Sequence, residues 1–220
     1  LARTVRKRVL KDLSQLSEKE PEKYTAFWNE FGRSFKEGLA TDPTAKEEIL
    51  PFIRYATSLD EETLTSLDEY LERMSDTQDE IYFVLADDVH SAARSPHLDP
   101  LTARGLEVLY WVDPLDAFLT PMLTEYKGKK LRNVDDAGLE LPEIDEPADE
   151  DPKEPLLAEK LFNLFVGRCV TVLGERIIEV RESKVLKNSP VRLLSPQDTE
   201  GRDMQRLQRY LDQNYEVPKK

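Results

Sequence analysis

The sequence predicts an α/β protein with a small, mainly parallel sheet and covering helices, followed by a second small α+β domain. Two observations lead to this fold class. Between residues 51 and 138, short β-rich runs alternate with helical stretches, which is typical of parallel strands connected by helices. An acidic, proline-rich segment at 139–155 then separates the rest of the chain, as an exposed linker between domains does.

Length and composition set limits on the class of protein. Of the 220 residues, 39% are hydrophobic, so the chain can bury a substantial core. The formal net charge of −13 repels the phosphates of nucleic acids. A single cysteine, Cys169, allows no internal disulfide, which fits a reducing compartment, and no apolar run approaches the roughly 20 residues that cross a bilayer. We therefore expect a cytoplasmic protein that binds neither nucleic acid nor membranes.

Helices are expected within residues 1–50. In the first, apolar residues recur at helical spacing, at Val5, Val9, Leu13 and Leu16. In the second, an aromatic stripe lies on one helix face and predicts core packing; it comprises Tyr24, Phe27, Trp28, Phe31 and Phe35. Because no capping residue precedes Leu1 and no initiator methionine is present, we expect the chain to continue upstream.

The α/β unit at 51–138 contains three strand candidates and two helix candidates. The strands are "FIRYATS" at 52–58, "IYFVLA" at 81–86 and "LEVLYWV" at 106–112. The helices between them are "SLDEYLERMS" at 66–75 and "DDVHSAARS" at 87–95. Strands that alternate with helices in this way predict the mainly parallel sheet.

The third strand leads directly into another predicted helix. Asp113 is placed to cap it, with Pro114 as its first residue and Asp116 favouring the positive end of the helix dipole. Its apolar stripe is Leu115, Leu119, Met122 and Tyr126. Phe118 lies on the flank of this stripe and is expected to be half exposed, and Pro121 predicts a kink because it has no N–H to donate.

Beyond the linker, the pattern predicts a small α+β unit at 156–220. It consists of a helix that ends at Gly174, strands at 176–183 and 191–195, and a last helix at 201–213.

Motifs for catalysis are missing from the sequence. The two histidines, His90 and His97, lie in no metal-ligand pattern, and there is no phosphate-binding glycine loop or nucleophile motif. We therefore assign no catalytic residue, no cofactor-binding residue and no metal ligand to this chain.

Several strings resemble, in order and spacing, the middle and C-terminal regions of the 90-kDa heat-shock protein chaperones, the bacterial HtpG type most closely. They are "FWNEFGRSFKEG", "TSLDEYLERM", "DEIYFVLADD", "SPHLDPLTARGLEVLYWVDPLDAF", "LTEYKGKKLRNV" and "VLGERIIEVRESKVLKNSPVRL". The resemblance covers nearly the whole chain. It implies the end of a middle domain at 1–138, the linker at 139–155 and part of a C-terminal domain at 156–220.

The resemblance also implies a function. The family is a homodimeric chaperone that uses ATP and Mg²⁺ and binds partly folded client polypeptides. Its nucleotide site, and the middle-domain arginine that reaches the ATP, are expected upstream of Leu1, and its dimerisation helices beyond this chain. By position, Phe118, Met204 and Leu207 match client-contacting residues. The sequence departs from the bacterial pattern at Ala117, where an acidic residue is usual, and at Glu200, where an apolar residue is expected.

Two alternatives remain open from the residues alone. The first is that the chain is an inert pair of scaffold or interaction domains. The second is that it is an unrelated α/β enzyme. An enzyme of this fold should hold a deep pocket with a perturbed ionisable group at the carboxyl ends of the strands. A client binder should expose an apolar patch.

The linker prediction is tested by limited proteolysis. A segment rich in charge and proline buries little surface, so protease should cut first between Glu140 and Glu154. Mass spectrometry of the first fragments locates the cut. Protection of this segment while the flanking units are cleaved would contradict the two-domain interpretation.

Overall fold

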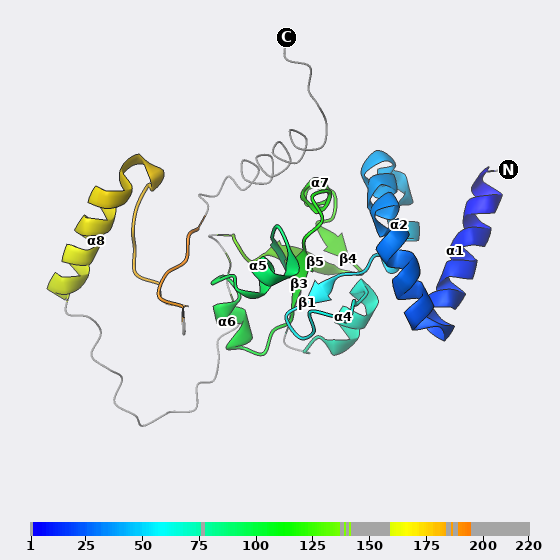
Figure 1. The fold of residues 1–220 in the computed structure, drawn as a ribbon, viewed down its shortest axis with the longest axis horizontal. Helices are drawn as coiled ribbons and strands as arrows, with labels where there is room; N and C mark the ends of the chain where they lie inside the picture. The colour runs from blue at the N-terminus through cyan, green and yellow to red at the C-terminus, as the bar shows by residue number, and fades with distance from the viewer. Residues whose placement is uncertain are drawn as a thin grey trace, which may run out of the picture.

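A computed structural model describes residues 2–75, 78–136, 139, 141, 159–183, 186 and 189–194 (Figure 1). Its helices are α1 (Ala2–Lys19), α2 (Pro21–Thr41), α3 (Lys46–Ile49), α4 (Leu67–Arg73), α5 (Val89–Ala93), α6 (Asp99–Thr102), α7 (Asp116–Leu119) and α8 (Glu159–Leu173), with 3₁₀ turns η1 (Pro43–Ala45), η2 (Leu50–Phe52) and η3 (Gly174–Arg176). Its strands are β1 (Ala56–Thr57), β2 (Glu80–Leu85), β3 (Val108–Trp111), β4 (Glu125–Tyr126) and β5 (Lys129–Asn133).

The sheet is mixed rather than mainly parallel, with strand order β1-β3-β2-β5-β4. The central strand β2 pairs in parallel with β3, as the alternating pattern predicted, and also in parallel with β5, which the pattern did not include. The outer pairs, β1 with β3 and β4 with β5, are antiparallel. The prediction was wrong at both edges: β4 and β5 are joined by a two-residue turn, which can only give antiparallel pairing, and β1 pairs antiparallel with β3 although β2 lies between them in sequence.

The β4–β5 hairpin is the element that the sequence pattern missed. Its two-residue turn is Lys127–Gly128, and both residues have positive φ, at 46° and 82°. Two positive φ values define the type I′ turn, whose twist matches that of the flanking strands. Glycine adopts this conformation without strain, whereas Lys127 does so at some cost. The predicted helix from Pro114 to Tyr126 therefore gives way to a strand before it reaches Tyr126.

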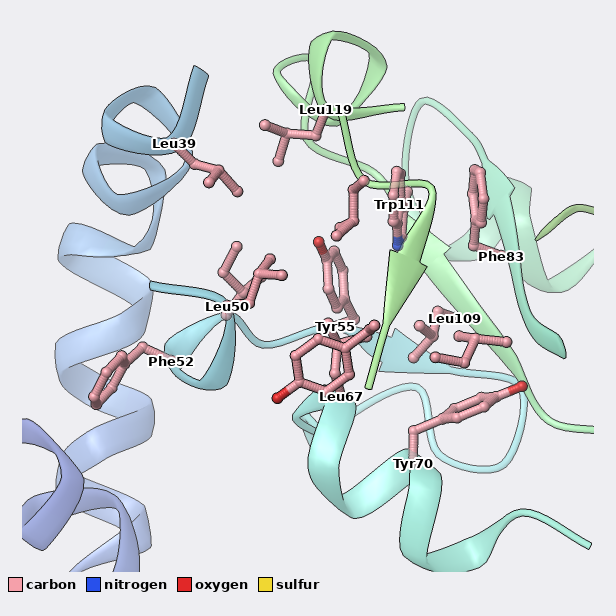
Figure 2. Packing of buried hydrophobic residues seen from close by; sticks show 14 of the residues in the cluster. Leu39, Leu50, Phe52, Tyr55, Leu67, Tyr70, Phe83, Leu109, Trp111 and Leu119 are labelled. Carbon is pink, nitrogen blue, oxygen red and sulfur yellow. The ribbon is translucent and has the colours of Figure 1, made fainter. Parts of the chain in front are cut away.

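Two buried clusters cover the two faces of the sheet. Alternate residues of β2 and β3 face opposite sides, so Phe83 and Trp111 pack toward α2 and α4 whereas Val84 and Tyr110 pack toward α5 and α6. Figure 2 shows the first cluster, in which side chains from α2, η2, α4, β2, β3 and α7 meet. Burial of both faces explains why the strand sequences are almost continuously apolar.

Helix α4 begins with a capping box. The Ser66 hydroxyl accepts from the Glu69 N–H at 3.1 Å, and a Glu69 carboxylate oxygen accepts from the Ser66 N–H at 2.7 Å. One turn later, the buried Tyr70 hydroxyl donates to the Glu107 carbonyl at 2.7 Å and accepts from the Tyr82 N–H at 3.1 Å. The helix is thus fixed to β2 and to the start of β3, which confirms the helix predicted at 66–75.

The helices α1 and α2 form a hairpin at one side of the sheet (Figure 1). The aromatic stripe of α2 is core only in part. Tyr24 and Trp28 are buried and Phe27 and Phe35 are half-buried, but Phe31 is 54% exposed and stacks on Phe27 at 5.2 Å between ring centroids. The rest of the domain covers only part of this aromatic stripe, so the edge of the stripe that contains Phe31 faces solvent.

The C-terminal region differs from the predicted α+β unit. Helix α8 confirms the helix that precedes Gly174, and none of its residues is buried. The described residues 177–183 and 191–194 contain no strand, so the strand predictions there were wrong. A strand needs a hydrogen-bonding neighbour, and none of the described strands lies beside them. The helix predicted at 201–213 and nearly all of the linker lie outside the described residues.

The close contact between Gly32 and Trp28 predicts a pair of opposite mutational effects. A methyl group at Gly32 would lie 2.6 Å from Cε2 of Trp28, whereas one at Gly38 would lie 4.0 Å from the nearest heavy atom, Cδ1 of Ile49. Gly32→Ala should therefore destabilise the protein by about 1–3 kcal/mol through overpacking. Gly38→Ala, the control on the same helix, should stabilise it by about 0.5–1 kcal/mol. Urea unfolding measures both. Equal effects of the two substitutions would show that the Trp28 contact does not limit the helix.

Candidate functional site

The candidate site is the turn between β3 and α7, at the carboxyl end of β3. The Asp113 carboxylate accepts from the Leu115 N–H at 2.9 Å, and the Asp113 carbonyl accepts from the Asp116 N–H at 2.8 Å. The Asp116 carboxylate reaches back to the Asp113 N–H at 3.1 Å. Asp113 thus organises the turn, but the prediction that it caps the helix was wrong: α7 begins at Asp116 rather than at Pro114, and its N-cap residue is Leu115.

Helix α7 ends sooner than the sequence predicted. We expected a kinked helix through Pro121, whereas α7 stops at Leu119. The Thr120 hydroxyl donates to the Ala117 carbonyl at 2.7 Å, and Pro121 has no N–H with which to continue the helical ladder. The result is a single compact turn, in which each side chain has a defined direction.

A buried ion pair holds this turn to helix α2. Lys36 Nζ lies 2.7 Å from Asp116 Oδ1 and donates to Oδ2 at 2.9 Å. The two side chains are 7% and 0% exposed. Burial raises the pKa of Asp116 above its ordinary value, and the adjacent Lys36 ammonium opposes that rise. The ammonium group therefore compensates the carboxylate charge where water cannot reach it.

Aromatic rings support the ion pair from the sheet side. Lys36 Nζ lies 5.0 Å from the centroid of the Tyr55 ring, which stacks on Trp111 at 5.6 Å. Trp111 in turn stacks on Phe83 at 4.0 Å (Figure 2). Burial, together with the Asp116 and Asp113 carboxylates, raises the pKa of Tyr55 well above its ordinary value, so this ring stays neutral beside the ammonium group.

Phe118 lies on the outer side of the turn. Its neighbours Ala117 and Leu119 are buried, with exposed fractions of 9% and 0%, whereas Phe118 is half-buried, as its position in the stripe predicted. Within the described residues, it belongs to neither core cluster and is not among the partly buried side chains that pack against them. Part of its side chain therefore remains at the surface.

Phe118 is one of several apolar residues of this stretch that keep some exposed surface. The other apolar side chains of this stretch that are partly or fully exposed are Val112, Pro114, Leu115, Pro121 and Met122. Met204 and Leu207, the other two predicted client-contacting residues, lie outside the described residues, as does Glu200. The structure therefore places one of the three predicted site residues.

Lys36 is the residue of this site that sequence reasoning missed. No role was predicted for it, although its position carries a signal. The buried residues of α2 after Tyr24 are Trp28, Gly32, Lys36 and Leu39, which follow one another at intervals of three or four. A lysine within such a stripe must meet an anion, because an unpaired buried ammonium is very costly.

Other features of the described residues give no catalytic chemistry. An open apolar groove of about 650 Å³ lies between α1 and α2, away from the turn, and is lined by Val5, Arg6, Val9, Leu10, Ser34, Phe35, Gly38 and Ile49. No cluster of three or more potential metal-ligating side chains is found in the described part of the chain. None of the helices described is both long enough and apolar enough to cross a membrane.

Comparison with known proteins identifies the class. The middle domain of a Plasmodium falciparum heat shock protein superimposes with a TM-score of 0.56 at 30% sequence identity, over 60% of this chain and 55% of that one. The fold is thus that of a heat-shock-protein middle domain. The family model for "Hsp90 protein" matches residues 1–216, and the chain belongs to the Hsp90 family.

Bacterial HtpG chaperones are among its relatives. The chain is 38% identical to the chaperone protein HtpG of Colwellia psychrerythraea over 214 residues, which is 96% of this chain and 32% of that protein. It is 39% identical to HtpG of Halorhodospira halophila over 203 residues, 91% of this chain and 32% of that protein. The chain therefore spans about a third of the length of these HtpG relatives, and the resemblance read from the sequence is confirmed.

The position of Phe118 predicts a small effect on stability. Phe118→Ala should cost less than about 1 kcal/mol of unfolding free energy, because the side chain is only partly buried and lies outside both core clusters. Leu119→Ala, the adjacent control, should cost about 2–5 kcal/mol because its side chain is fully buried. Urea unfolding of both variants decides the matter. A loss at Phe118 as large as that at Leu119 would show that Phe118 is a core residue.

Proposed function

We propose that this chain carries a client-binding surface of an Hsp90-type chaperone and binds partly folded polypeptides. Phe118 is the central contact, and Met204 and Leu207 contribute to the same apolar groove. The observation that carries the proposal is the outward, half-exposed placement of Phe118 on a turn that is held from inside by a buried ion pair. Membership of the Hsp90 family supports it.

The chemistry of the surface suits clients of variable sequence. Phe118 offers apolar area without requiring a hydrogen bond, so its contact does not depend on a particular polar partner. Methionine side chains adapt their shape, and Met122 and Met204 supply this property on the turn and in the C-terminal region. A partly folded chain exposes apolar segments, and such segments are the ligands that this surface fits.

The wider activity follows from the family and forms part of the proposal. The whole protein would be a cytoplasmic homodimer that binds clients in a cycle driven by ATP and Mg²⁺. Residues 1–138 would be the end of its middle domain, 139–155 a linker and 156–220 part of its C-terminal domain. Within this chain we assign no ATP-binding residue, and the alternative of an inert scaffold would leave the Phe118 surface without a ligand.

Client binding is tested with the 220-residue chain and fluorescently labelled, reduced and carboxymethylated α-lactalbumin, a permanently unfolded polypeptide. Phe118→Ala should weaken binding roughly tenfold, corresponding to the loss of about 1.4 kcal/mol at a central apolar contact. Phe118→Trp should preserve binding because it retains an aromatic ring. Met204→Ser and Leu207→Ser should each weaken it. Fluorescence anisotropy gives the dissociation constants.

The control for this experiment is Phe31→Ala, which removes an exposed aromatic ring from α2, away from the turn. It should leave the dissociation constant unchanged. If Phe118→Ala binds like the wild type, or if Phe31→Ala weakens binding equally, then the surface around Phe118 is not a specific client site.

A further inference from the structure

The buried ion pair does more than stability requires. Lys36 and Asp116 lie 80 positions apart in sequence, and each is almost completely removed from water. Desolvating two charges costs several kcal/mol per ion, and apolar residues of similar volume often replace such pairs with no loss of stability. A gain in folding free energy therefore does not account for the pair, and a role in fixing one particular local geometry does.

The geometry that it fixes is that of the turn carrying Phe118. The Asp116 carboxylate that meets Lys36 also accepts from the Asp113 N–H at 3.1 Å, and the Asp116 carbonyl accepts from the Thr120 N–H at 3.2 Å. One residue thus sets both the start and the end of α7. Phe118 itself is held by the bond from its N–H to the Leu115 carbonyl at 3.0 Å.

The direction of Phe118 follows from helical geometry. Successive residues of an α-helix are rotated by about 100°, so a residue two positions after Asp116 points about 200° away from it. Asp116 is drawn inward by Lys36, and Phe118 consequently faces outward. The exposed fractions agree, because Asp116 is 0% exposed whereas Phe118 is half-buried.

Lys36, the partner of Asp116, is itself held in place by its surroundings. Lys36 belongs to α2, a helix of almost six turns whose neighbouring inward residues Trp28, Gly32 and Leu39 are all buried. Its ammonium group also lies over Tyr55, whose ring is stacked on Trp111 of β3. The helix and the sheet therefore determine jointly where Asp116 is held.

We infer that Lys36 is a positioning residue for client binding, which acts through Asp116 to hold the Asp113–Thr120 turn with Phe118 outward. The inference rests on the proposed client-binding function of Phe118. Lys36 is buried and makes no direct contact with the client. Its contribution is to keep the contact residue in one direction, so that client binding does not have to order the turn first.

The test separates an effect on the position of Phe118 from an effect on protein stability by replacing both charged residues of the pair with neutral ones, and the resulting double variant is called the neutral-pair variant. Lys36→Met leaves a buried carboxylate without its partner and should lower the melting temperature. Lys36→Met combined with Asp116→Asn removes both charges but retains an oxygen that can accept from the Asp113 N–H, and it should melt above the single variant. The control, Arg33→Gln with Glu37→Gln, removes an exposed ion pair of 3.5 Å from the same helix.

Two readouts are taken in the 220-residue chain, well below the lowest melting temperature of the set. Binding of the unfolded α-lactalbumin probe should weaken about fivefold in the neutral-pair variant, a coupling of the size found between contacting residues. Amide hydrogen exchange should accelerate at residues 113–120 but not in β2 or α4. The control variant should change neither quantity. Adding Phe118→Ala to the neutral pair should produce little further loss of binding, because both changes act on one contact.

The outcomes distinguish the two proposals. If Phe118→Ala weakens binding while the neutral-pair variant binds like the wild type, then Lys36 and Asp116 are merely structural and the positioning role is overturned. Unchanged exchange at residues 113–120 in the neutral-pair variant would also overturn it. If Phe118→Ala has no effect, then the client site itself is wrong, and the positioning role falls with it.

Discussion

The arrangement of helix α2 and the turn after β3 depends on one buried ion pair, Lys36 with Asp116, whose side chains are 7% and 0% exposed. The pair favours one rotation of α2 about its axis, because a rotation that turned Lys36 outward would leave the Asp116 carboxylate buried without a counter-ion. It also commits the chain after β3 to a tight turn rather than a long helix. Local conformation at Asp113–Thr120 is thus decided by a residue 80 positions away.

The mixed sheet makes this contact possible. Parallel pairing of β2 with β3 brings the carboxyl end of β3 to the same edge as that of β2, where α2 crosses. The Tyr55 ring lies next to the Lys36 ammonium group, Trp111 stacks on Tyr55, and Phe83 stacks on Trp111. In this low-dielectric surrounding the attraction between the charges is strong, and the same surrounding makes either charge costly alone.

Features set by residues close in sequence could be predicted from the sequence, whereas features set by contacts between distant residues could not. Helix α4, the central strands β2 and β3 and the half-buried Phe118 follow from local patterns and were predicted correctly. The β4–β5 hairpin was not predicted, because its turn at Lys127–Gly128 carries a weaker signal than Asn-Gly or Asp-Gly. The partner of Lys36 could not be predicted either, since a burial stripe demands an anion without saying which of 44 acidic residues supplies it. Phe31 was misread because periodicity gives a face but not how much of that face is covered.

The central claim is that the outer side of the β3–α7 turn contacts unfolded polypeptide. The most direct measurement is photo-crosslinking of the 220-residue chain to the unfolded α-lactalbumin probe, with p-benzoylphenylalanine placed at position 118 in one variant and at position 31 in another. The same photoreactive residue stands at both positions, and Phe31 is the more exposed of the two native side chains, so lower accessibility does not explain a lower yield from position 31. The account predicts efficient crosslinking from position 118 that excess unlabelled probe competes away, and only background from position 31. Equal crosslinking from both positions, or none from position 118, would contradict it.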